Sequence, residues 1–146
     1  AQTRWKFDEA FTLQVILAQR RHEQEQVPSV ARHPRDGGLL AQFDARLPFA
    51  LTDGQRTIGD EIAGDLGRTR PMHRLLQGDV GSGKTIVALR AMLAVIDSGG
   101  QAALLAPTEV LAHQHARTIS ALLGDLAEGG LLGGSTEGTR VALLAN

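Results

Sequence analysis

The sequence predicts an α/β fold, in which a parallel β-sheet with flanking helices is preceded by a helical segment. Two observations lead to this prediction. From residue 72 onwards, short apolar runs alternate with segments of helical periodicity, and apolar runs bounded by helices are typical of parallel strands that are buried on both faces. A glycine-rich loop also joins the first apolar run to the helix that follows it.

The first third of the chain contains two helical patterns and a break. Residues 4–26 carry apolar side chains at helical spacings, which predicts a helix of several turns. Residues 28–38 are rich in Pro, Gly, Arg and His and indicate a loop, since proline disfavours helix in the residue before it. Residues 39–47 predict a short helix that stops at Pro48.

The helical pattern resumes behind a capping box. Thr52 and Gln55 have the spacing at which each side chain satisfies the backbone N–H of the other. Ile58, Ile62 and Leu66 then line one face of a helix at a spacing of four. Further helices are predicted over residues 84–98 and from Thr108, and strands are predicted over residues 72–77, 102–106 and 140–145.

Composition excludes several classes of protein. The 146 residues contain no cysteine, which excludes disulfide scaffolds, cysteine nucleophiles and the usual zinc sites. Fifteen basic residues against sixteen acidic ones give a net charge of −1, which excludes a basic nucleic-acid-binding arm but allows a local patch. No apolar run reaches the length of a membrane span and the start is unlike a signal peptide, so we expect a cytoplasmic protein without a membrane partner.

The strongest motif matches the pattern G-x-x-x-x-G-K-[ST]. It consists of Gly78, Asp79, Val80, Gly81, Ser82, Gly83, Lys84 and Thr85. The glycines let the backbone curl so that N–H groups face phosphate oxygens. Lys84 is the expected catalytic residue, with its ammonium on the β- and γ-phosphates, and Thr85 is expected to hold Mg²⁺. The motif predicts a nucleotide-binding loop, which kinases, transporters, GTPases and helicases share.

Three stretches around this motif resemble the first motor domain of the RecG family of branch-migration helicases, which are superfamily 2 DNA translocases. They are LPFALTDGQ (47–55), the run from RPM to LLQGDVGSGKT (70–85) and APTEVLAHQH (106–115), and residues 6–10 resemble the helix that leads into that motor. The resemblance implies a RecA-like P-loop NTPase domain that uses ATP and Mg²⁺. It also implies action on stalled forks and Holliday junctions in DNA repair and recombination.

Two positions distinguish this family from a similar one. The similar motor of the transcription-repair coupling factor usually has an aromatic residue where this chain has Ser82 and a second threonine where it has Glu109, so both positions favour RecG. The primosome helicase is a more distant relative. A stand-alone P-loop nucleotide-binding module and a P-loop kinase are the alternatives from other classes, and the Gln55 motif and residues 107–109 argue against the kinase.

The resemblance also implies roles for single residues. Gln55 matches the glutamine that reads the adenine edge, although it is equally placed as the capping partner of Thr52. Phe49 is expected either to stack near the base or to be a core aromatic. Pro107, Thr108 and Glu109 match a motif that contacts the DNA backbone in related helicases, and the alternative is a plain helix cap at Thr108.

Three charged or aromatic groups have simpler expected roles. Arg68, Arg70 and Arg74 form a cationic cluster that is either a phosphate-binding patch or, as we favour, a solvated face. His113 is expected to be solvated and His115 packed. The aromatic residues near the start, Trp5, Phe7 and Phe11, are expected to pack the first helix against a neighbour.

The domain organisation follows from the resemblance. We expect residues 1–47 to be a helical segment and linker, and residues 48–146 to be the N-terminal part of the ATP-binding domain. The chain opens with Ala1 and stops after an apolar run, so we expect a fragment that lacks the acidic pair and the arginine needed for hydrolysis and is inactive alone. The parent protein is expected to be a monomer that binds ATP and branched DNA.

Overall fold

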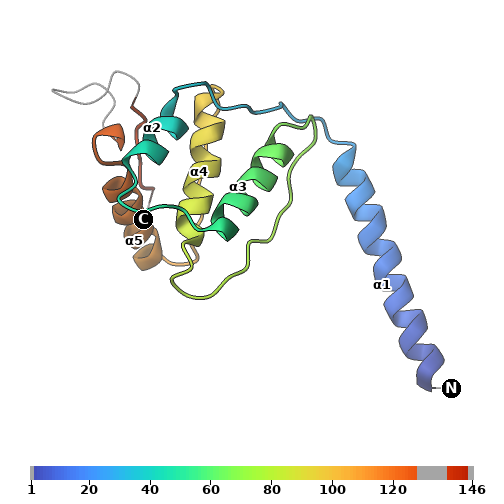
Figure 1. The fold of residues 1–146 in the computed structure, drawn as a ribbon. Coiled ribbons are helices and arrows are strands. Elements are labelled where there is room, and N and C mark those ends of the chain that lie inside the picture. Colours follow the sequence, from blue (N-terminus) through green and yellow to red (C-terminus); the bar gives the residue numbers. More distant parts are fainter. Residues whose placement is uncertain (1, 128–137, 145–146) are drawn as a thin grey trace.

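The computed structural model of this protein describes residues 2–127 and 138–144, and within them the chain forms six helical elements. Figure 1 shows how they are arranged. The helices that the sequence predicts are confirmed, and every boundary that it predicts lies within two residues of the observed one. The elements are α1 (Gln2–Glu25), α2 (Leu39–Arg46), α3 (Asp53–Leu66), α4 (Lys84–Asp97), α5 (Glu109–Leu123) and the 3₁₀ helix η1 (Gly124–Ala127).

The predicted parallel sheet is wrong. Over the described residues the chain contains helices and extended segments but no strand. The three apolar runs at 72–77, 102–106 and 140–144 are extended, and Leu75, Leu105 and Leu144 are 80%, 94% and 94% exposed. An apolar run becomes a strand only where a neighbour lies about 4.8 Å away and satisfies its backbone groups. The apolar pattern predicted burial, but it carried no information about such a neighbour.

Helix α4 is the centre of the core. It packs against α3 on one side and α2 on the other, as Figure 1 shows. This 14-residue helix is the most apolar of the described helices, so several of its faces can be buried at once. The buried core comprises Leu39, Phe43, Leu89, Leu93, Ile119, Leu123 and Leu126, from α2, α4, α5 and η1.

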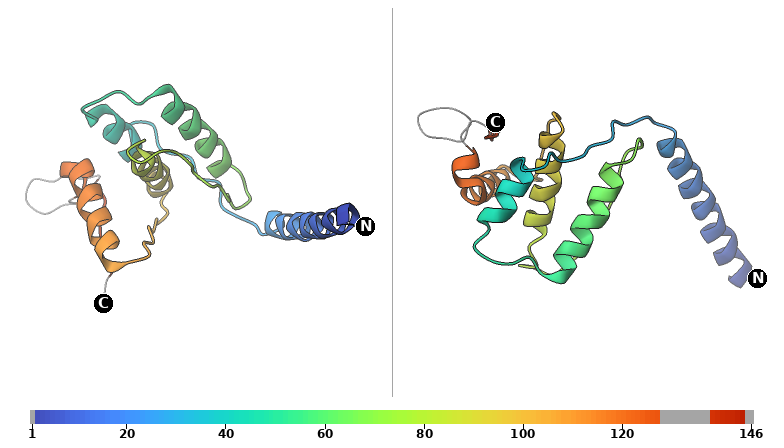
Figure 2. Two further views of the ribbon diagram at one scale, coloured as in Figure 1. Left: turned by 90° about the horizontal axis from the view of Figure 1, so that it is seen from below. Right: turned by 45° about the horizontal axis from the view of Figure 1, so that its top comes forward.

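Helix α1 projects away from this core in every view (Figures 1 and 2). All of its described side chains are exposed, including Trp5 at 77%. The rings of Phe7 and Phe11 stack on each other with centroids 6.1 Å apart. The expectation that these aromatic residues pack against a neighbour is therefore wrong for the part of the chain that the structure describes. None of the described helices has the length and apolar character that a bilayer span requires.

The segment between α1 and α2 is a loop, as predicted, but it is fixed to the ends of two helices. The backbone N–H groups of Ser29 and Arg32 donate to the carbonyls of Thr69 and Leu66, at 2.9 and 2.8 Å. The guanidinium of Arg32 also donates to the carbonyl of Ser98, at 3.4 Å. The chain therefore crosses the C-terminal ends of α3 and α4 before it enters α2.

Helix α2 begins on a carboxylate from another helix. Asp97, the last residue of α4, is buried and accepts the backbone N–H groups of Leu39 and Leu40 at 2.7 and 3.0 Å. Gly38, at the N-cap, offers no side chain, and a Cβ there would lie 2.6 Å from Asp97 Oδ1. The first turn of α2 is thus capped through space, which ties α2 to the end of α4.

Candidate functional site

The glycine-rich loop at 78–85 connects an extended segment to α4 and is open to solvent. Gly81 and Gly83 have φ angles of 82° and 81°, in the left-handed region that only glycine adopts readily. The loop is closed by a hydrogen bond from the N–H of Ser82 to the carbonyl of Asp79, at 3.2 Å. Asp79, Val80 and Ser82 are exposed. The two glycines give the backbone the curl that the motif predicts.

The N-terminus of α4 differs from those of its neighbours. Helices α3 and α5 are capped by the hydroxyl oxygens of Thr52 and Thr108, and α2 is capped by Asp97. The N-cap of α4 is Gly83, which makes no side-chain hydrogen bond to the first turn. N–H groups at such a helix end carry a partial positive charge and attract anions. This end of α4 is therefore suited to a phosphate.

Lys84 folds back onto the loop that precedes it. Its ammonium donates to the carbonyls of Gly78 and Asp79, at 2.8 and 2.7 Å. The ammonium thus lies inside the curl of the loop, next to the start of α4. Thr85 follows in the first turn and is half-buried. The loop, Lys84 and Thr85 thus lie next to one another at the start of α4, as the motif requires of a site for a nucleoside triphosphate.

Gln55 joins α3 to the phosphate loop. The capping box is confirmed, because the N–H of Gln55 donates to Thr52 Oγ1 at 3.2 Å and the N–H of Thr52 donates to Gln55 Oε1 at 3.0 Å. The amide nitrogen of Gln55 donates in addition to the carbonyl of Ser82, at 3.0 Å. Sequence reasoning missed this second bond, because nothing in the spacing of residues 55 and 82 signals it.

Phe49 lies on the segment that precedes α3 and is 46% exposed. The alternative that it is a core aromatic is therefore wrong. Its stacking on a base stays a prediction.

Residues 107–109 form the start of α5. Pro107, Thr108 and Glu109 are exposed, and Thr108 Oγ1 accepts the N–H of Leu111 at 3.3 Å. The helix cap at Thr108 is therefore confirmed, and the DNA contact stays a prediction. His113 is exposed as expected, with its Nε2 3.6 Å from a carboxylate oxygen of Glu109, and His115 is half-buried.

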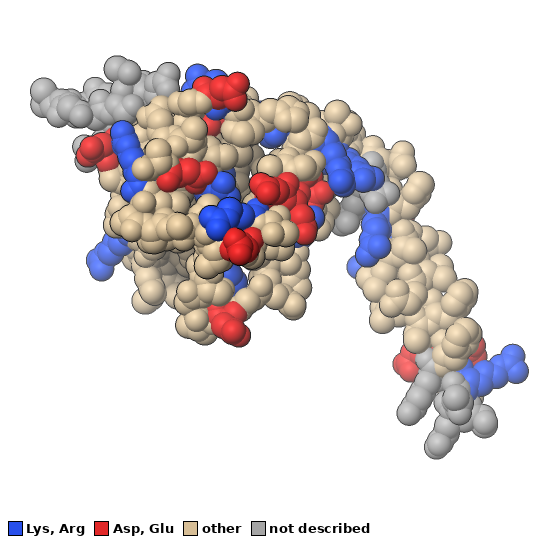
Figure 3. All heavy atoms as spheres, in the orientation of Figure 1, with Lys and Arg blue, Asp and Glu red and all other residues tan. Residues whose placement is uncertain are grey.

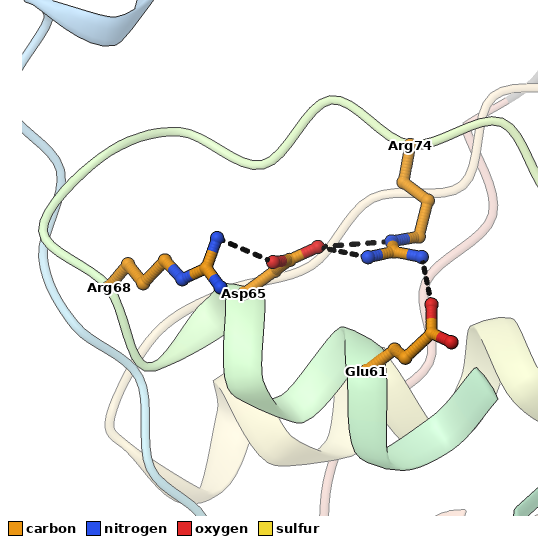
Figure 4. Close-up of polar contacts among 4 residues, drawn as sticks. All are labelled: Glu61, Asp65, Arg68 and Arg74. Carbon is orange, nitrogen blue, oxygen red and sulfur yellow. Dashed lines mark hydrogen bonds and ion pairs between the residues drawn. The ribbon is translucent and has the colours of Figure 1, made fainter. Parts of the chain in front are cut away.

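The predicted cationic cluster is divided by an ion-pair network (Figure 4). Arg74 donates to Asp65 at 2.6 and 3.0 Å and to Glu61 at 2.6 Å, while Arg68 lies 3.1 Å from the other oxygen of Asp65. The hydrogen bond from Arg74 lowers the pKa of Asp65 below its ordinary value, and the nearby charges of Arg74, Arg68 and Arg70 add to this effect. Arg68, Arg70 and Arg74 are all exposed, and the choice between a phosphate-binding patch and a solvated face stays a prediction. Arg74 ties α3 to the segment leading into the phosphate loop.

The phosphate loop offers few protein ligands for a metal ion such as Mg²⁺. Among the described residues there is no group of three or more His, Asp or Glu side chains that could hold a metal ion. Mg²⁺ in nucleotide sites keeps several waters and binds the phosphates of the nucleotide. The hydroxyl of Thr85, at the start of α4, fits this mode of binding.

Comparison with known families gives a match over most of the chain. The family model described as DEAD/DEAH box helicase matches residues 52–146. The ATP-dependent DNA helicases RecG of Mycobacterium bovis and Mycobacterium leprae are 56% and 53% identical to the chain, over 99% of its length. That of Synechocystis is 52% identical over 79% of the chain. The chain spans 20% of the length of the M. bovis relative, 19% of the M. leprae relative and 14% of the Synechocystis relative.

A solved structure is similar as well. The structure of RecG bound to a three-way DNA junction matches with a TM-score of 0.73 and 41% identity, over 79% of this chain and 16% of that one. The resemblance to RecG helicases that the sequence indicated is thus confirmed, both in the sequence and in the arrangement of the helices.

Proposed function

Because the chain belongs to the DEAD/DEAH box helicase family, we propose that it forms the ATP-binding part of an ATP-dependent DNA helicase that remodels branched DNA. Stalled forks and Holliday junctions are the proposed substrates, in DNA repair and recombination. The observation that carries the proposal is the phosphate loop, whose lysine, glycines and uncapped helix end lie together at the start of α4. Acting on DNA, the protein would work in the cytoplasm.

The phosphate loop supplies the proposed ATP contacts. The ammonium of Lys84 now rests on two carbonyl groups, and it would turn to the β- and γ-phosphates, which are stronger acceptors. The backbone N–H groups from Gly81 to Thr85 would surround the same phosphates. Thr85 would hold Mg²⁺ through its hydroxyl, and the bound ATP supplies the phosphoanhydride bond whose hydrolysis drives the motor.

Gln55 and Phe49 supply the proposed base contacts. The amide of Gln55 would accept a hydrogen bond from adenine N6 and donate one to N7. The amide nitrogen has two N–H groups, so it could donate to N7 and keep its hydrogen bond to the carbonyl of Ser82, which would couple base recognition to the position of the loop. Phe49 is exposed on the segment just before α3 and would stack near the base.

The proposal also covers contacts with DNA and the domain organisation. Pro107, Thr108 and Glu109 would approach the DNA backbone, because they are exposed at a helix start and the positive end of a helix suits a phosphate. Residues 48–146 would form the N-terminal part of the ATP-binding domain and residues 1–47 would lead into it. Within that leading segment, α2 is the part that docks, since Leu39 and Phe43 belong to the core around α4.

Substitution of Lys84 tests the nucleotide site. Lys84→Ala is expected to weaken ATP binding by about a hundredfold, since a charge-assisted bond to phosphate contributes about 3 kcal/mol. Helix content, measured by circular dichroism, is expected to stay unchanged because the ammonium contacts only exposed loop carbonyls. Arg46→Ala, at the exposed end of α2, is the control and is expected to bind ATP as before. Unchanged ATP affinity in a folded Lys84→Ala variant would contradict the proposed site.

The helicase proposal needs a second measurement, made on the natural full-length protein. Hydrolysis of ATP is expected to rise when a synthetic fork or Holliday junction is added, and Lys84→Ala is expected to abolish that rise. ATP binding without any effect of DNA on hydrolysis would instead favour a nucleotide-binding module without motor function.

A further inference from the structure

A pocket lies where the C-terminal part of α1 meets the turn after α3, apart from the phosphate loop. Its volume is about 180 Å³, and residues from both sides form its wall. Figure 3 shows Lys and Arg side chains gathered where α1 joins the rest of the molecule. The lining residues are Arg21, Asp65, Arg68, Arg70, Pro71, Met72 and His73. Three guanidinium groups and one imidazole thus line a pocket that contains a single carboxylate.

The carboxylate of Asp65 offsets only one of the three guanidinium charges that line the pocket. One of its oxygens accepts two hydrogen bonds from Arg74, which is outside the pocket wall, and the other lies 3.1 Å from Arg68. Its pKa is lowered by these partners, so it stays ionised and bound to them. Asp65 therefore holds Arg68 in place at the pocket.

Arg21 reaches the pocket from a different part of the chain. It belongs to α1, whose described side chains are all exposed, and it has no hydrogen bond or ion pair within the described residues. Arg68 and Arg70 are on the turn after α3. An anion in the pocket would be contacted from both sides and would hold α1 against the turn.

We propose that this pocket binds a phosphate group of the DNA backbone, between Arg21 of α1 and Arg68 and Arg70 of the turn. The inference rests on the proposed function, since it assumes a DNA substrate. A guanidinium group recognises phosphate oxygens in a planar, bidentate manner. The three arginines of the pocket are exposed and the pocket opens to solvent, which allows a continuous polyanion to pass along it. Binding would fix the direction of α1 relative to the core whenever DNA is present.

Salt dependence of DNA binding tests the proposal in the natural full-length protein. The double variant Arg21→Gln/Arg70→Gln removes two of the three guanidinium groups and keeps good helix formers. Losing one phosphate contact is expected to reduce the slope of log affinity against log salt by about 0.9, which corresponds to about fivefold weaker binding at 0.15 M salt. Arg20→Gln is the matched control, because Arg20 is the exposed neighbour of Arg21 and does not line the pocket. It is expected to keep the slope of the unsubstituted protein.

Two further outcomes would overturn the inference. An unchanged slope in the double variant, with intact binding of a Holliday junction by the unsubstituted protein, contradicts the pocket alone. Failure of the unsubstituted protein to bind any branched DNA contradicts the proposed function itself, and the inference with it.

Inorganic phosphate serves as the second probe, at fixed ionic strength. If the pocket is a site for free phosphate, adding phosphate would raise the melting temperature of the unsubstituted protein but not that of the double variant. The slope of log DNA affinity against log salt would then be the same in both proteins. That result would overturn the assignment to DNA. ATP affinity, measured in all three proteins, is expected to be equal because the pocket is separate from the phosphate loop.

Discussion

At the scale of single residues, Gln55 performs two tasks with one amide group. Its oxygen accepts the N–H of Thr52 and so completes the cap of α3, while its nitrogen donates to the carbonyl of Ser82 in the phosphate loop. The start of α3 and the position of the loop are therefore connected through one side chain. Gly83 stands next to this contact, and a side chain there would collide with the amide of Gln55.

Gln55→Glu separates the two tasks. A carboxylate can still accept the N–H of Thr52, but it cannot donate to Ser82 or to adenine N7. We expect α3 to keep its stability and the preference for ATP over GTP to disappear, measured as the ratio of the two dissociation constants. Equal weakening of both nucleotides would show that the new charge merely repels phosphate, and would count against the adenine role.

Thr52→Ala is the complementary control for Gln55→Glu. It removes the cap that Thr52 Oγ1 provides, at a cost of about 1 kcal/mol in the free energy of unfolding. Gln55 keeps its bond to Ser82 in this variant, so the preference for ATP is expected to remain.

Residue chemistry is where the sequence was most informative. The phosphate loop and both threonine caps depend on residues within eight positions of one another, and such local patterns are visible in the sequence. The contacts from Gln55 to Ser82 and from Arg74 to Glu61 join residues 27 and 13 positions apart. They arise only when the fold brings the partners together, so no spacing rule reveals them.

At the scale of elements, α3 and α4 meet at a glycine. Arg90 of α4 donates two hydrogen bonds to Asp44 of α2, at 2.8 and 2.9 Å, and this contact with the carboxylate raises the pKa of Arg90. On its way the guanidinium passes Gly59 of α3, where a Cβ would lie 2.5 Å from Nη1. The missing side chain at position 59 therefore gives Arg90 room to connect all three helices.

A pair of glycine substitutions on α3 tests this role. Gly64 has nothing within 4 Å of the position of a Cβ, so Gly64→Ala is expected to stabilise the protein by about 0.5–1 kcal/mol through helix propensity. Gly59→Ala has the same propensity gain, but it must displace Arg90 from Asp44. We expect it to lower the free energy of unfolding, measured by urea denaturation. A gain equal to that of Gly64→Ala would contradict the packing described at position 59.

Helix positions could be predicted from the sequence because their signals are local. Prolines, caps and apolar periodicity predicted the ends of α2, α3 and α4 and the start of α5 within two residues. The prediction of a parallel sheet is wrong because a strand needs a partner strand. Over the described residues, the runs at 72–77 and 102–106 are extended but form no hydrogen-bonded ladder with a neighbour. Apolar character alone cannot tell a paired strand from an unpaired extended segment.

At the scale of the whole molecule, the chain has a packed part and an arm. Helices α2, α4 and α5 share one core and α3 packs against α4, whereas α1 extends away with its described side chains exposed. A helix without tertiary packing is only marginally stable in water. The two parts are therefore expected to differ in how often their backbone hydrogen bonds open.

Amide hydrogen exchange of the 146-residue chain measures this difference. Backbone amides of α1 are expected to exchange at least about a hundredfold faster than those of the buried stretch of α4, because opening α1 exposes no core. Amides of α2 serve as the internal control, since α2 is as short as eight residues yet docked. Similar protection in α1 and α4 would mean that α1 has a packing partner.

The cap of α2 by Asp97 has a consequence for the order in which the chain can fold. The N–H group of Leu39 and its acceptor are 58 positions apart, and α2 is too short to persist alone. During synthesis at 5–20 residues per second, about 3–12 s pass between the two ends of this contact. The first turn of α2 therefore stays uncapped until the end of α4 has left the ribosome. Helix α2 is therefore expected to dock only after α4 is available, although it precedes α4 in the chain.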